Sequence, residues 1–359
     1  MTTVEWVALS LLGWRQGAQR AIASWLGDPD GASQNGACSG GLSRVLARIS
    51  RVQVEPGDIA GALRAAETLL GSRDPDVAVV CWDGPQYPAA LKAIADPPPV
   101  LWVRGTLAVL RRPTVALVGS RAGTPHARAL ARELGTDLVA RGVTVVSGLA
   151  RGVDGAAHRG ALFGQGATVA ILGSGVDTVY PPEHSDLAAG IIDQGALVSE
   201  LPPGTPPRSA HFPLRNRLIS GVAQAVVVVE ATERSGSLIT ARLALEQGRE
   251  VMAVPGGVVG RRNRGAHALL KDGAKLVEDV DDILEELRIP SVEGVEAPAD
   301  DLEDDPLLVQ LVRGESYDVD QLVALSGVDS PALLVRLSEL EFAGRVERLA
   351  GGRFMRVGS

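Results

Sequence analysis

From residue 114 onward, short apolar runs alternate with longer segments whose apolar residues recur at helical spacing. The runs do not alternate polar and apolar positions, which is typical of strands buried on both faces of a parallel sheet. The pattern predicts strands at 115–118, 143–146, 168–172, 196–199, 225–229, 251–254 and 275–277. It predicts helices at 125–140, 153–163, 184–194, 238–247, 265–271 and 280–288. We therefore expect an α/β fold, with a doubly wound, Rossmann-like parallel sheet in a domain spanning 76–289.

The region before this sheet has a different pattern. Residues 1–26 indicate short helices with apolar faces, residues 27–41 a loop rich in Gly, Ser, Asp and Asn, and residues 42–70 a helix broken at Pro56-Gly57. We expect residues 1–75 to form a small helical module of the SAM or helix-hairpin-helix kind. Strands starting at 77 and covering 101–103 then extend the sheet, and the prolines before Val100 exclude a central ladder position there.

The chain after residue 289 indicates a linker and a small domain. Residues 290–305 hold seven Asp and Glu and no Lys or Arg, as in a solvated linker. In 306–359 the pattern predicts helices at 306–313, 319–325 and 330–343, then a hairpin with strands 345–349 and 353–357. This order is typical of a winged-helix domain. Its third helix carries Arg336 against Glu339 and Glu341, so major-groove reading and protein contact both remain open.

Charge and cysteine content narrow the class of protein. The formal net charge is −8, but residues 201–275 contain 11 Arg and Lys against 5 Asp and Glu. An anionic partner of this middle region is therefore compatible with the acidic total. Two cysteines argue against a disulfide framework and favour the cytoplasm, and no metal-ligand spacing occurs. Charged residues interrupt the apolar N-terminus, so we expect no membrane segment.

The segment SGLARGVDGAAHRGAL, residues 147–162, joins a predicted strand to a predicted helix through a glycine turn. A strand, a glycine turn and a helix N-terminus form the geometry that binds anions. Asp154 lies at the start of the helix, where a carboxylate caps free N–H groups, and His158 lies one turn later on the same face. The plainer alternative is that Asp154 only caps and His158 only packs.

In an open doubly wound sheet, ligands bind beyond the strand C-termini where the strand order reverses. The loops at 119–124 and 230–237 follow the two strands that meet there, and both offer hydroxyls, N–H groups and an arginine to a phosphate. The first loop is not G-x-G-x-x-G, and no P-loop occurs, so neither a dinucleotide nor ATP hydrolysis is expected. The turn PGGVVG at 255–260 keeps a nucleoside-monophosphate hydrolase as the enzyme alternative.

The segment HFPLRNR, residues 211–217, places two arginines beside an aromatic ring. Single-stranded nucleic acid needs cations for its phosphates and aromatic faces for its bases. Core packing of Phe212 is the alternative, as is an internal ion pair of one arginine. For the ion pair we favour Arg217, with Glu230 or Glu200. Aromatic residues make up 3% of the chain, so binding is expected to be mainly electrostatic.

The motifs GSR at 119–121, 147–162, FPLRNRLISG at 212–221 and SGSLITA at 235–241 resemble the DNA-processing protein A (DprA/Smf) family over about residues 80–280. The resemblance implies a dimeric protein, not an enzyme, that protects incoming single-stranded DNA. It also implies loading of the RecA recombinase in natural transformation, with single-strand-binding protein as a further candidate partner. No cofactor, metal or catalytic residue is predicted. The predicted DNA- and phosphate-binding residues are Gly119, Ser120, Arg121, Ser147, Gly148, Arg151, His211, Phe212, Arg215, Asn216, Arg217, Ser235, Gly236, Ser237 and Thr240.

Overall fold

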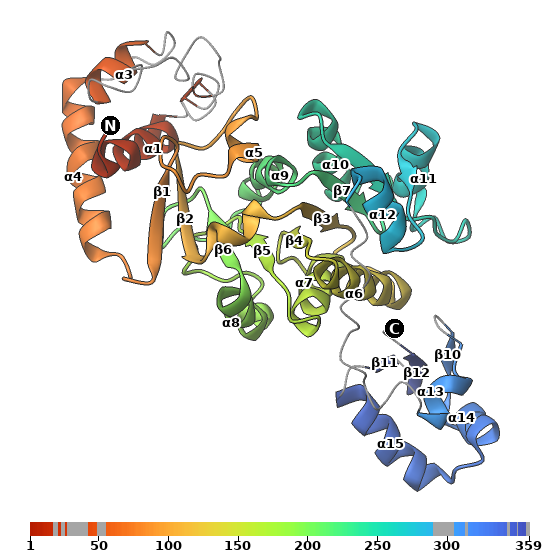
Figure 1. Ribbon diagram of the computed structural model, residues 1–359. Coiled ribbons are helices and arrows are strands. Elements are labelled where there is room, and N and C mark those ends of the chain that lie inside the picture. The colour runs from red at the N-terminus through yellow and green to blue at the C-terminus, as the bar shows by residue number, and fades with distance from the viewer. Residues whose placement is uncertain are drawn as a thin grey trace.

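The computed structural model describes residues 1–16, 21–22, 26, 42–48, 55–289, 305–312, 315–342, 345–349 and 351–356. Its centre is a nine-stranded sheet with the order β1-β2-β6-β5-β4-β3-β7-β8-β9 (Figure 1). In the sheet order, neighbouring strands from β6 to β9 are parallel, whereas β2 pairs antiparallel with both β1 and β6. The strands are β1 Val77–Cys81, β2 Val100–Gly105, β3 Thr114–Val118, β4 Thr144–Ser147, β5 Thr168–Ile171, β6 Ala196–Ser199, β7 Ala225–Val228, β8 Glu250–Ala253 and β9 Lys275–Leu276.

Helices cover both faces of the sheet, which explains the unalternating apolar strands. Ala116 and Val118 of β3 pack with α9, α10 and α11, whereas Val115 and Leu117 pack with α6, α7 and α12 on the other face. The doubly wound, Rossmann-like architecture is therefore confirmed. The helices are α6 Pro125–Ala140, α7 Val153–Phe163, α8 Ser185–Gln194, α9 His211–Val222, α10 Ser237–Glu246, α11 Arg264–Lys271 and α12 Val280–Leu287.

Helix α9 is the main element that the sequence pattern does not predict. Its first half, HFPLRNR, is polar apart from Phe212 and Leu214, and its buried apolar residues gather in the second half, at Leu218, Ile219 and Val222. Pro213 is compatible with the first turn of a helix, where its missing N–H has no intrahelical acceptor. The arginine-rich motif therefore lies on a helix that begins at the C-terminal edge of the sheet.

The N-terminal helices α1 Thr3–Gln16, α3 Leu42–Arg48 and α4 Pro56–Ser72 pack beside β1 and β2 (Figure 1). Trp6 of α1 lies 6.1 Å from Trp82, ring centre to ring centre, and both rings are buried. Pro56 begins α4, in agreement with the predicted break. The predicted loop at 27–41 lies outside the described residues. Short helices α5 Ala89–Lys92, η1 Leu107–Arg111 and η2 Pro182–His184 fill the connections.

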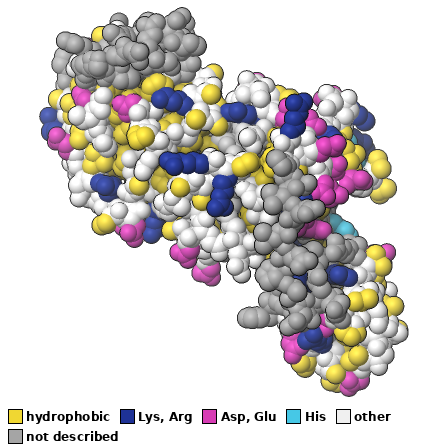
Figure 2. All heavy atoms as spheres, viewed as in Figure 1, with side chains coloured by type: hydrophobic (Ala, Val, Ile, Leu, Met, Phe, Trp, Pro, Cys, Tyr) yellow, Lys and Arg dark blue, Asp and Glu magenta, His cyan; other side chains and the backbone are white. Residues whose placement is uncertain are grey.

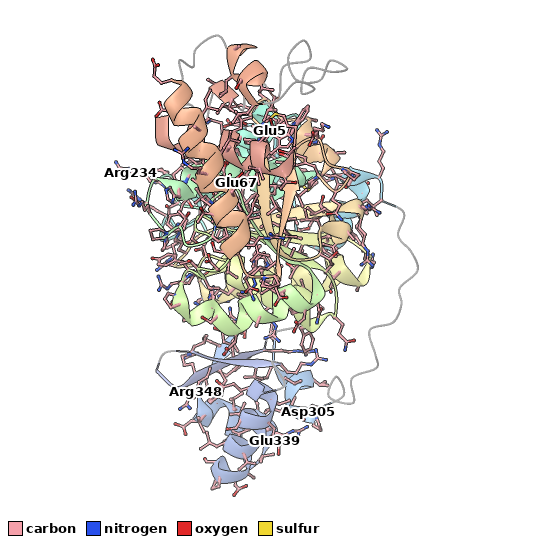
Figure 3. All side chains as sticks on the ribbon, turned by 90° about the vertical axis from the view of Figure 1, so that its left-hand side faces the viewer. Glu5, Glu67, Arg234, Asp305, Glu339 and Arg348 are labelled. Carbon is pink, nitrogen blue, oxygen red and sulfur yellow. The ribbon has the colours of Figure 1, made fainter. Side chains whose placement is uncertain are left out.

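The C-terminal unit has a core of its own, formed by residues such as Leu322, Leu337 and Phe354. It is a winged helix: a three-stranded sheet of order β10-β12-β11 packs against helices (Figure 3). Strand β10 was not predicted, and α13 ends at Gln310, earlier than expected. Most of the predicted linker, 290–304, lies outside the described residues. The elements are α13 Pro306–Gln310, β10 Ser316–Tyr317, α14 Val319–Ser326, α15 Ser330–Phe342, β11 Val346–Leu349 and β12 Arg353–Arg356.

Candidate functional site

The strand order reverses between β3 and β7, and a pocket of about 670 Å³ opens at the C-terminal ends of these two strands. We call it the switch-point pocket. Loop 119–124 forms one wall, loop 230–237 with the start of α10 forms a second, and the first turns of α9 form a third. Ten of the predicted site residues line it: Gly119, Ser120, Arg121, Phe212, Arg215, Asn216, Ser235, Gly236, Ser237 and Thr240.

Close packing and hydrogen bonds within the protein fix the conformation of loop 119–124. A Cβ at Gly152, where φ is +75°, would lie 2.3 Å from the Ser120 carbonyl oxygen, so only glycine allows this close approach. The buried Glu230 carboxylate accepts hydrogen bonds from the N–H and hydroxyl of Thr124. The N–H groups of Ser120, Ala122, Gly123 and Thr124 all have intramolecular acceptors. Four of the six N–H groups of the loop are therefore engaged internally, and the Arg121 side chain is the main group that the loop offers to a ligand.

Arg121 is exposed at the mouth of the pocket. Its guanidinium carbon lies 5.0 Å from the ring centre of Phe212, and the Phe212 ring lies 5.6 Å from that of Tyr180. No carboxylate among the described residues forms an ion pair with Arg121, so its charge is available to a ligand. A cation above an aromatic pair combines the two groups that a nucleotide needs, one for the phosphate and one for the base.

Arg215 lies in the floor of the pocket and is buried. Its Nη1 donates to the carbonyl oxygens of Gly148, at 2.8 Å, and of Ile171. Burial lowers the pKa of Arg215 to about 10. Burial also raises the pKa of Asp154, and the positive charge of Arg215 opposes this rise. Arg215 thus braces the turn after β4, and a Cβ on Gly148 would collide with its guanidinium.

The carboxylate of Asp154 accepts from the N–H groups of Gly148 and Ala150, at 3.1 and 3.4 Å. It therefore caps the glycine turn, whereas α7 itself begins without a side-chain cap. His158 is fully buried, and its Nδ1 lies 2.7 Å from the Thr168 hydroxyl. Burial lowers the pKa of His158 to about 3. Packing therefore describes His158, whereas Asp154 holds the glycine turn instead of capping α7 and also lines the switch-point pocket.

Five predicted site residues do not line the pocket. Arg217 forms ion pairs with Glu200, at 2.7 Å, and with Asp96, at 3.0 Å, so the internal pairing favoured for it is present. Arg151 forms an ion pair with Glu183 on the surface. The Ser147 hydroxyl donates to the Leu117 carbonyl. Gly148 packs under Arg215, and His211 lies at the first position of α9.

The pocket also contains residues that the sequence did not indicate. Tyr180 follows β5, and Ser209 and Pro207 precede α9. Pro207 and Ser209 are close to the HFPLRNR segment in the sequence, whereas no sequence signal marks Tyr180. Two exposed arginines, Arg208 and Arg234, adjoin lining residues, and Figure 3 shows Arg234 projecting from the surface. Among the described residues no group of three or more His, Cys, Asp or Glu is placed to hold a metal ion. No helix in the same residues is long and apolar enough to cross a bilayer.

Comparison with known families matches residues 78–288 to DNA recombination-mediator protein A and residues 294–352 to the DprA winged helix domain. Protein Smf of Escherichia coli is 43% identical over 280 residues, which are 75% of each chain. The solved DprA of Streptococcus pneumoniae has a TM-score of 0.70 and 33% identity, covering 80% of this chain and 98% of that one. A Helicobacter pylori DprA structure, described by its single-stranded DNA binding mode, has a TM-score of 0.54 and 27% identity, covering 59% and 95%.

Proposed function

Because the chain belongs to the DNA recombination-mediator protein A (DprA/Smf) family, we propose that it is a DNA-processing protein that binds single-stranded DNA in the switch-point pocket. The observation that carries this proposal is the position of Arg121, which is exposed and lies over the Phe212–Tyr180 ring pair at the pocket mouth. The guanidinium binds a phosphate, and the rings and pocket walls receive a base.

The charges around the pocket support a single strand as the ligand. Arg121, Arg208 and Arg234 are exposed on three segments that surround the mouth, so cations extend beyond one phosphate. A single strand can turn an unstacked base into a concave site, whereas a duplex keeps its bases paired and stacked inside. We therefore propose that the sheet domain binds oligo-dT more tightly than a duplex of equal length.

We further propose that the pocket binds and does not hydrolyse. Its buried Asp154 accepts from two turn N–H groups beside the Arg215 charge, and Glu230 holds Thr124. These contacts give both carboxylates a structural role, since one holds the turn after β4 and the other holds loop 119–124. This argues against the hydrolase alternative. From the family resemblance we also propose a cytoplasmic role in which the protein protects incoming single strands and loads RecA, with single-strand-binding protein as a further candidate partner.

We also propose that the protein is a homodimer that associates through the edge of its sheet. Strand β9 is an edge strand, and it exposes Leu276. Light scattering at tens of micromolar, the order at which weak homodimers form, tests this proposal. A strict monomer there contradicts it.

The central experiment measures oligo-dT binding by the full chain over a range of salt concentrations. Arg121→Ala removes one charge-assisted contact, so binding weakens by about 1–3 kcal/mol. The slope of log K against log salt falls by about 0.7, the value for one single-strand phosphate. Arg242→Ala is the matched control, because Arg242 is exposed on α10 but does not line the pocket. Wild-type affinity and slope in a folded Arg121→Ala protein would show that the pocket is misassigned.

A further inference from the structure

The helices of the winged helix present an apolar surface to solvent. In α15, Leu333, Leu337 and Leu340 face the unit's core, whereas Leu334 and Val335 are 44% and 63% exposed. Leu325 at the end of α14 and Val328 in the following turn are 47% and 40% exposed. We call these four exposed residues, Leu325, Val328, Leu334 and Val335, the helix-turn-helix face.

The opposite side of the unit is already occupied. Glu347 of β11 forms an ion pair with Arg128 of α6 at 2.6 Å, and the Arg345 guanidinium lies 5.7 Å from the Phe163 ring of α7. In Figure 3, Arg348 of β11 lies on the side nearer the sheet domain, and Glu339 of α15 lies at the far end. The strands therefore contact the sheet domain, and α15 is left to solvent.

The charge around the helix-turn-helix face is acidic. Between residues 319 and 342 the chain carries Asp320, Asp329, Glu339 and Glu341, and Arg336 is the single cation. Arg336 is occupied, since its Nε donates to Asp305 at 2.7 Å and its Nη1 to Glu339 at 2.7 Å. Figure 2 shows hydrophobic side chains on the surface of this unit, with both acidic side chains and Lys or Arg among them.

An apolar surface with acidic neighbours does not suit duplex DNA, which is the usual partner of a helix-turn-helix. A helix that reads the major groove needs donors for base edges and cations for the flanking phosphates. Leucine and valine supply no donor, and the acidic side chains repel phosphate. An apolar stripe with an acidic rim instead complements an amphipathic helix whose polar side carries Lys and Arg.

We propose that the helix-turn-helix face binds a basic amphipathic helix of a partner protein. The apolar side of that helix packs on Leu334 and Val335, and its cations meet Asp320, Asp329 and Glu341. The site is separate from the switch-point pocket, whose lining residues lie between 118 and 240. The winged helix is then the part of the chain that recruits protein, while the sheet domain binds DNA.

The test uses the full chain and an 18-residue helical peptide of Leu and Lys with one apolar side. A scrambled peptide of the same composition and a Leu/Glu peptide are the reference probes. We expect micromolar binding of the Leu/Lys helix only. Leu334→Ser and Val335→Ser should each weaken it about tenfold, as for side chains central to an interface. Val309→Ser is the matched control, since Val309 is exposed on α13 outside the face.

Charge reversal gives a second, independent readout. Glu341→Lys should weaken the Leu/Lys helix and reduce the salt dependence of its binding, and oligo-dT affinity should not change in any of these variants. The proposal fails if the scrambled or acidic peptide binds equally well, or if Val309→Ser weakens binding as much as Val335→Ser does. It also fails if duplex DNA binds and Val335→Ser abolishes that binding. Loss of oligo-dT binding by Arg121→Ala tests the pocket separately.

Discussion

The Arg121 guanidinium lies 5.0 Å from the ring centre of Phe212, although the two residues come from the loop after β3 and from the second position of α9. The contact joins the cation of one pocket wall to the aromatic ring of another. Either group alone is common on a protein surface, but together they match one nucleotide. One residue supplies charge and the other an aromatic face. Substitutions at Arg121 and at Phe212 therefore test the two expected contributions to binding, charge and stacking, separately.

Phe212→Leu should weaken oligo-dT binding by about 1–3 kcal/mol, because one base loses its stacking partner. Since no cation is removed, the slope of log K against log salt should stay near the wild-type value, unlike that of Arg121→Ala. Fluorescence anisotropy at several salt concentrations measures both quantities. Phe212→Trp, which keeps an aromatic face, should retain binding. Equal losses in Phe212→Leu and Phe212→Trp would indicate a packing role for this residue instead.

Arg215→Met should destabilise the fold by about 1–3 kcal/mol, the range for leaving buried hydrogen-bonding groups without a partner. The substitution leaves the buried Asp154 without its neighbouring cation and takes a donor from two carbonyl groups. Urea denaturation measures the loss. Adding Asp154→Asn should recover part of it, because the uncompensated charge is then absent. A stable Arg215→Met protein with weakened DNA binding and a reduced salt slope would make Arg215 a phosphate ligand after all.

His158 should make the fold less stable as the pH falls below neutrality. Burial lowers its pKa to about 3, whereas the imidazole of the unfolded chain titrates near its ordinary value of about 6.5. Between these values the unfolded state takes up a proton that the folded state does not, which costs up to about 1.4 kcal/mol per pH unit. His158→Gln should flatten the pH dependence of the unfolding free energy between pH 6.5 and 5. An unchanged slope would show that other groups cause it.

Deleting residues 305–359 should leave oligo-dT affinity within about fivefold of the full chain. The pocket lies entirely in the sheet domain. The Arg128–Glu347 ion pair that joins the two parts is about one-third exposed and therefore contributes at most about 1 kcal/mol. Arg128 also donates to the Gly123 carbonyl, in the loop that carries Arg121, so a small change is expected. Loss of most of the affinity on truncation would place the main DNA site in the winged helix.

Local pattern was sufficient to predict most of the architecture. Apolar, β-branched runs such as Val143–Val146 have few alternatives to a buried strand, and turns rich in glycine and serine follow several of these runs. Because the C-terminal ends of parallel strands meet at one edge, the loops at 119–124 and 230–237 were expected to lie together, and they line one pocket. Helix α9 was missed because its first half lacks apolar periodicity.

The sequence by itself determined the strands of the nine-stranded sheet, the order of the motifs and the location of the pocket, because these depend on neighbouring residues and on general rules of strand connection. Only the tertiary structure decided what each arginine does. Arg121, Arg215 and Arg217 look alike in the sequence, but Arg215 meets a carbonyl 67 positions away and Arg217 a carboxylate 121 positions away. A guanidinium is a ligand for DNA only where no internal acceptor has already engaged it, and which acceptors surround it is set by long-range packing.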